Sequence, residues 1–122
     1  GRYLAFGGKG IEIWDARTWI PIKYLKGHFR DIYSLEFSYD SKYLSSSAYN
    51  TIKVWDTVIW EQSSQINNGA FPIKSISFNH DSNLLAVASY RHKIRVWKKE
   101  YLDPSKGSNV LLKLIPFQKS NK

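Results

Sequence analysis

The chain has 122 residues, is 43% hydrophobic and 16% aromatic, and carries a formal net charge of +8. This composition is typical of one globular domain and excludes an intrinsically disordered chain. The apolar runs are too short for a membrane-spanning helix, and the lack of cysteine excludes disulfides, thiolate metal sites and cysteine nucleophiles. A chain without cysteine is compatible with the reducing interior of a cell, so a cytoplasmic location is expected.

The N-terminal part of the chain is predicted to form three strands. The segments RYLAF (residues 2–6) and GIEIW (10–14) flank FGGKG, whose glycines suit a tight hairpin. The mainly apolar segment WIPIKYL (19–25) follows them. No G-K-[ST] motif and no helical pattern follow the glycines, so a phosphate-binding loop is not expected.

The middle of the chain contains a complete set of four predicted strands. Alternating apolar residues in IYSLEF (32–37) indicate a strand with one buried face. An Asp-Ser turn leads to KYLSSSA (42–48), and a short polar hairpin connects this strand to TIKVWD (51–56). The fourth strand is predicted within VIWEQSSQI (58–66).

The same order then repeats with an offset of about 41 residues. IKSISF (73–78), NLLAVAS (83–89) and KIRVWK (93–98) match the preceding strands, VLLKLIPF (110–117) is predicted as the outer strand, and Trp14, Trp55 and Trp97 are spaced by 41 and 42 residues. One four-stranded meander cannot cover both of its faces, so such units must stack, and radial stacking gives a propeller. The predicted fold class is all-β: a β-propeller of four-stranded antiparallel blades, here an incomplete set of about three.

The segment from residue 27 to residue 56 resembles a WD repeat (Trp-Asp repeat). The matching positions are Gly27-His28, Asp31, Phe37-Ser38, Asp40, Ser45 to Ser47 and Trp55-Asp56. The resemblance implies a partial first blade over residues 1–26, a complete blade over 27–67, a third blade with a basic C-terminal segment over 68–118, and a tail over 119–122. Closed propellers need about four or more blades, so either the chain is a piece of a longer polypeptide, which is the favoured interpretation, or other chains complete the ring. The open sheet faces of the isolated chain are expected to favour aggregation or dimerisation.

The resemblance also implies a structural network, because in this family a His, a Ser or Thr, an Asp and the Trp form hydrogen bonds that connect strands. The corresponding residues here are His28, Ser46 (with Ser45 as the alternative), Asn50 and Trp55. The Asp position falls on Tyr49 or Asn50; Asn50 can accept a hydrogen bond, whereas Tyr49 cannot replace a carboxylate.

The third unit departs further from the family pattern. Val87 stands at the Ser position, Arg91 at the Asp position, and Gly69 or Ala70 at the His position. Because a buried polar group without its partner costs stability, the outer units are expected to be less stable than the central one.

The polar residues do not predict catalysis or a bound cofactor. His28, Asp31 and Ser34 lie close in sequence, but no G-x-S-x-G motif or oxyanion hole accompanies them, and the family uses this His structurally. His80 and His92 lack a spaced set of metal ligands. The chain is therefore predicted not to be an enzyme, with no catalytic residues, no metal and no cofactor.

Function is expected on the loops that converge at one end of the stacked sheets. These loops carry the predicted partner-binding residues Phe29, Arg30, Tyr33, Tyr49, Phe71, Tyr90, Arg91 and His92. The prediction is a rigid scaffold for protein–protein interaction in a multi-subunit assembly, with cytoskeletal or ciliary assemblies among the candidates. Trp19 and Trp60, at matching points of two units, are interpreted either as packing at the rim or as aromatic contacts for a partner.

The alternative function is a basic surface that binds nucleic acid or another polyanion, such as acidic cytoskeletal tails or phospholipid. Between residues 91 and 122, nine Lys and Arg residues stand against Glu100 and Asp103. The candidate contacts are Arg91, Lys93, Arg95, Lys98, Lys99 and the tail. The other interpretation of this excess is a solvated segment that keeps the protein in solution.

Overall fold

The computed structural model describes residues 2–28, 30–67, 72–90, 94–101 and 112–117. These ranges contain eleven β-strands and no α-helix: β1 (Tyr3–Gly7), β2 (Ile11–Asp15), β3 (Pro21–Leu25), β4 (Ser34–Phe37), β5 (Tyr43–Ala48), β6 (Thr51–Asp56), β7 (Glu61–Asn67), β8 (Ile73–Phe78), β9 (Leu84–Ser89), β10 (Ile94–Tyr101) and β11 (Leu112–Phe117). The described part of the chain holds no helix long and apolar enough to cross a bilayer.

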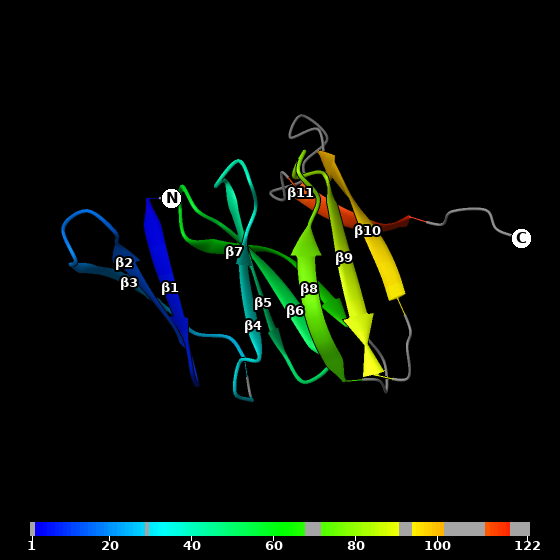
Figure 1. Cartoon of the computed structure of the whole chain (residues 1–122), viewed down its shortest axis with the longest axis horizontal. Coiled ribbons are helices and arrows are strands. Elements are labelled where there is room, and N and C mark those ends of the chain that lie inside the picture. Colours follow the sequence, from blue (N-terminus) through cyan, green and yellow to red (C-terminus); the bar gives the residue numbers. More distant parts are fainter. Residues whose placement is uncertain (1, 29, 68–71, 91–93, 102–111, 118–122) are drawn as a thin grey trace, which may run out of the picture.

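The strands form three antiparallel sheets, in the orders β1-β2-β3, β4-β5-β6-β7 and β8-β9-β10-β11. Every strand pairs with its neighbour in the sequence, so each sheet is a meander. The sheets lie side by side, with the β4–β7 sheet (the central sheet) between the other two (Figure 1). The all-β prediction is confirmed, and the sheets are consistent with partial propeller blades. The described residues do not form a closed ring, so closure stays a prediction.

Two hydrophobic cores lie between the sheets, one on each face of the central sheet. Alternation along β5 and β6 directs Tyr43, Ile52 and Val54 toward the β8–β11 sheet, where they pack with buried residues such as Leu85 and Val87. On the other face, Leu44 and Trp55 pack with the buried face of the first sheet, formed by Ile11, Ile13 and Leu25. The central sheet is therefore covered on both faces: all six residues of β5 are buried, whereas in β9 only every second residue is.

The two turns that follow Trp14-Asp15 and Trp55-Asp56 share one geometry, which is set by the aspartate. Asp56 Oδ1 accepts hydrogen bonds from the backbone N–H groups of Val58 (2.7 Å) and Ile59 (3.3 Å), and Trp60 N donates to Asp56 O at 2.7 Å. Asp15 caps the matching turn in the first sheet in the same way. The last residue of each turn, Trp19 or Trp60, takes a positive φ of 59° or 56°.

These turns determine where the outer strands begin. The outer strands are predicted within segments 19–25 and 58–66, and the structure begins β3 at Pro21 and β7 at Glu61. The reason is that each aspartate holds the residues just after it in the turn, before the outer strand begins. The strand pairing also shifts in register by a bulge at Trp14 and at Trp55. Sequence alternation alone does not distinguish an apolar turn from the beginning of a strand.

Candidate functional site

The described parts of the loops that are predicted to converge lie at one end of the three sheets. Ile32 N donates to Gly8 O (3.0 Å), which connects the β3–β4 loop to the β1–β2 hairpin. Ile73 N donates to Tyr49 O (2.6 Å), which connects the start of β8 to the β5–β6 turn. Figure 1 shows β8 rising from this end and β9 running back into it. We call it the loop end; backbone hydrogen bonds connect its described loops across neighbouring sheets.

The described members of the predicted partner-binding set are presented at the loop end. The Arg30 guanidinium lies over the Tyr49 ring, 4.8 Å from its centroid. Tyr33 and Tyr90 are 59% and 53% exposed, and their backbone N–H groups donate to Ser47 O and Pro72 O. Phe29, Phe71, Arg91 and His92 lie outside the described residues.

The structure brings three members of the predicted network together inside the central sheet. The Trp55 indole N–H donates to Ser46 Oγ at 2.9 Å, and Ser46 Oγ lies 2.7 Å from His28 Nε2. Ser46 is fully buried. Its other acceptor, Lys53 O, is 3.5 Å away, so the hydroxyl proton is better placed on the short contact to His28 Nε2. We therefore assign the ring hydrogen of His28 to Nδ1.

The fourth predicted member, Asn50, lies beside this chain of hydrogen bonds. Its Oδ1 accepts a long hydrogen bond from the Thr51 hydroxyl (3.4 Å), and both residues line the same pocket as His28. Tyr49, the other residue considered for the Asp position, has a positive φ of 50° and contacts Arg30 instead.

A buried lysine beside the network was not anticipated from the sequence. Lys53 is 9% exposed, and its ammonium donates to Gln65 Oε1 (2.7 Å) and Gln62 Oε1 (3.0 Å). Burial lowers the pKa of Lys53. Burial, together with the nearby Lys53 charge, lowers the pKa of His28 to about 4, so His28 is neutral at pH 7.

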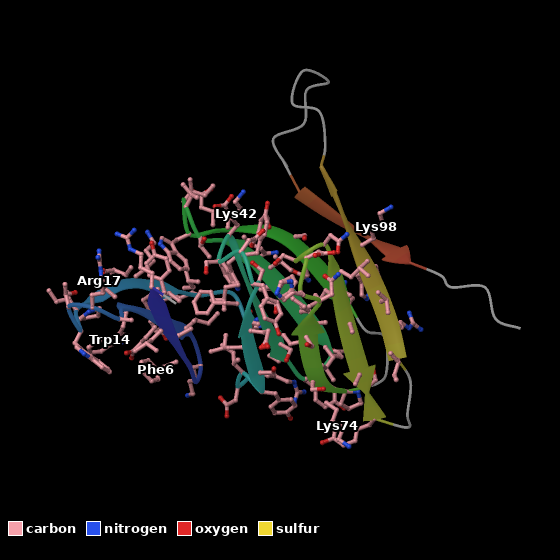
Figure 2. The ribbon with its side chains drawn as sticks, turned by 45° about the horizontal axis from the view of Figure 1, so that its top comes forward. Phe6, Trp14, Arg17, Lys42, Lys74 and Lys98 are labelled. Atoms are coloured by element: carbon pink, nitrogen blue, oxygen red, sulfur yellow. The ribbon has the colours of Figure 1, made fainter. Side chains whose placement is uncertain are left out.

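The two other sheets lack this arrangement at the matching register. In the β8–β11 sheet the position of Ser46 is taken by Val87, and the Trp97 indole N–H is buried without a hydrogen-bond partner among the described residues. In the first sheet the position is taken by Phe6, which meets Trp14 edge to face at 6.3 Å. The Trp14 indole bonds Glu12 at the surface instead (3.1 Å). Figure 2 shows Phe6 and Trp14 on the side of that sheet that faces away from the others.

The two rim tryptophans differ because, among the described residues, Trp60 contacts a neighbouring sheet and Trp19 does not. Trp60 meets Tyr3 of the first sheet edge to face at 5.1 Å and is half-buried. Trp19, at the matching turn, is 65% exposed. The packing interpretation therefore describes Trp60, while Trp19 remains open to a partner.

The remaining polar residues do not assemble a reactive site in the described part of the chain. No group of three His, Asp or Glu side chains there could hold a metal ion. Of the residues that could suggest a triad, His28 contacts Ser46, Ser34 pairs with Ser47 in the sheet ladder, and Asp31 is exposed.

Comparison with protein families identifies two matching segments. The family described as WD domain, G-beta repeat, matches residues 19–56 and 62–98. Both matched segments begin near the start of an outer strand and end at or just after the Trp of the following sheet. A comparison with curated proteins gives no significant match.

Proposed function

The chain belongs to the WD40 family of WD-domain, G-beta repeats, and from that premise we propose that it is a rigid scaffold that binds other proteins within a multi-subunit assembly. Repeats of this family generally serve as protein-interaction scaffolds. The proposal assigns the binding surface to the loop end and gives the chain no catalytic role. It also keeps the proposed units 1–26, 27–67 and 68–118, the tail 119–122, and a cytoplasmic location.

The observation that carries the proposal is the display of Tyr and Arg side chains at the loop end. Tyr33 and Tyr90 are more than half exposed, and Arg30 is stacked on Tyr49. Tyr and Arg are enriched among the residues that dominate binding energy at protein interfaces. The backbone hydrogen bonds between sheets order these loops in advance, which reduces the conformational entropy lost on binding.

The described basic residues give less support to the polyanion alternative. Arg95 and Lys98 are exposed on β10, but they are three residues apart in a strand and so belong to opposite faces of the sheet. Their register partners, Val87 and Leu84, are also on opposite faces. Two charges that are separated by a sheet do not form one contact surface.

Site-specific photo-crosslinking tests the scaffold proposal. A photoreactive phenylalanine analogue at Tyr33 or Tyr90 is expected to crosslink discrete proteins in cell extract. The matched control is Tyr39, which is 66% exposed but lies in the turn between β4 and β5, at the opposite end of the sheets. Arg30→Ala should reduce the crosslinks from Tyr33. Equal yields from Tyr39, or crosslinks to nucleic acid alone, would contradict the proposal.

A further inference from the structure

A pocket of about 290 Å³ opens beside the buried lysine at the loop end. It lies between the β3–β4 loop, the β5–β6 turn, the start of β6 and the end of β7. We call it the Lys53 pocket; it is lined by Gly27, His28, Arg30, Ala48, Asn50, Thr51, Lys53 and Gln65.

The charge of the Lys53 pocket is positive. Lys53 is an ammonium ion with three donors, two of which are directed to the amide oxygens of Gln62 and Gln65. Arg30 adds a second cation at the exposed side. The described lining contains neither Asp nor Glu. A buried cation without an opposite charge is unfavourable, so a bound anion would stabilise it.

The neutral groups of the pocket are suited to a carboxylate. The Thr51 hydroxyl can donate a hydrogen bond, and His28, with its hydrogen assigned to Nδ1, can donate a second one. A water molecule occupies about 30 Å³ of liquid volume, so the pocket can hold a carboxylate together with the aliphatic part of a side chain. Pockets for larger ligands are usually bigger and mostly apolar, which does not describe this lining.

We propose that the Lys53 pocket binds the carboxylate of an Asp or Glu side chain from a partner protein. The source is a partner because the pocket opens at the loop end, where the exposed Arg30 both lines the pocket and stacks on Tyr49. This inference depends on the proposed scaffold function and specifies one feature of the partner: an acidic side chain that enters the pocket while neighbouring groups contact the tyrosines.

The test uses two small probes that differ only in charge. N-acetyl-glutamic acid α-amide carries the proposed carboxylate, and N-acetyl-glutamine amide is its neutral counterpart. In NMR titrations, the glutamate probe should shift the backbone amide signals of Gly27 and Thr51 to saturation, with at least about tenfold higher affinity than the glutamine probe, as expected for a charged hydrogen bond. This comparison needs only the unmodified protein.

A variant and a control then assign the effect to the lysine. Lys53→Met keeps the length of the side chain and should weaken the glutamate probe at least about tenfold, while Lys23→Met, at an exposed position on β3, should not. Thermal unfolding checks that the variants fold. Equal binding of the two probes, tighter binding of inorganic phosphate, or an unchanged affinity in Lys53→Met would overturn the proposal. Crosslinking from Tyr33 and Tyr90 reports on the scaffold function independently of this result.

Discussion

The central sheet and the β8–β11 sheet share the same order of strands, but they hold their tryptophans differently. Trp55 is 4% exposed and donates its indole N–H to Ser46, which also contacts His28. Trp97 packs against the core between the two sheets, yet its indole N–H has no partner in the described part of the chain because Val87 replaces the serine. The sheets can therefore stack without the polar network, which among the described residues is formed in the central sheet.

The same two sheets also differ in how far their residues are buried. The central sheet has a neighbour on each face, and β6 is buried from Ile52 to Trp55. On the open face of the β8–β11 sheet, Ile94 is 71% exposed. Equivalent positions in the repeat should therefore respond to the same substitution with different losses of stability.

The largest expected difference is between Ile52 and Ile94, which occupy the same position relative to Trp55 and Trp97. Ile52 has no exposed surface, so Ile52→Ala should lower the free energy of unfolding by about 3–4 kcal/mol. Ile94→Ala should change it by less than about 0.5 kcal/mol. Denaturant unfolding of the two variants measures both values. Similar losses would mean that the central sheet is not enclosed.

The second prediction concerns the network itself. Ser46→Ala removes the partner of the Trp55 indole and of His28, and should cost about 2 kcal/mol. Ser47 is equally buried, but its hydroxyl has no hydrogen-bond partner among the described residues, so Ser47→Ala is the matched control. It should be neutral within about 0.5 kcal/mol, or slightly stabilising. Equal losses of unfolding free energy for the two variants would show that the network does not stabilise the central sheet.

The third prediction is a pH dependence that is specific to the central sheet. His28 has a folded pKa of about 4, below its unfolded value of about 6.5, so the unfolded chain binds more protons between these values. Stability should therefore fall as the pH is lowered from 6.5 toward 4. Allowing for partial exposure, the expected loss is about 1–2 kcal/mol.

Measuring unfolding at several pH values for the parent chain and for His28→Gln isolates this contribution. Carboxylates that titrate in the same range affect both proteins equally. The variant should lose less stability over the window. Identical pH profiles would show that His28 is not held in its neutral form by the fold.

The smallest expected effect is at Gly27, where the backbone has a φ of 155°. A Cβ atom there would lie 3.3 Å from Lys53 Cε and 3.4 Å from the Trp55 ring. Gly27→Ala should cost about 1 kcal/mol, and Gly8→Ala, where a Cβ would meet no atom within 4 Å, should cost less. Thermal unfolding of the pair is sufficient; a larger loss for Gly8→Ala would be inconsistent with the packing around Lys53.

Much of the fold could be predicted from the sequence because its signals are local. The alternation in IKSISF and the spacing of Trp14, Trp55 and Trp97 indicated the strands and the repeat, and the order of strands in each sheet followed from short connections. The three strands of the first sheet were also predicted, because three extended segments precede residue 26.

The parts that could not be predicted depend on which sheet lies next to which. Lys53 alternates with apolar residues in β6 and suggests a solvent-facing side chain, yet a sheet that is covered on both faces buries it. Trp19 and Trp60 have matching sequence positions, and only the presence of Tyr3 across the interface distinguishes them. The contact between Arg30 and Tyr49 likewise joins two loops whose paths alternation does not specify.

Hydrogen exchange of backbone amides tests the stacking of the three sheets most directly. In the 122-residue chain, the amides of β5 and β6 should exchange slowest, at rates set by global unfolding, because both faces of the central sheet are covered. The amides of β2 and β9 should exchange faster. Equal protection in all three sheets, or slower exchange in β2 than in β6, would contradict a central sheet enclosed by two neighbours.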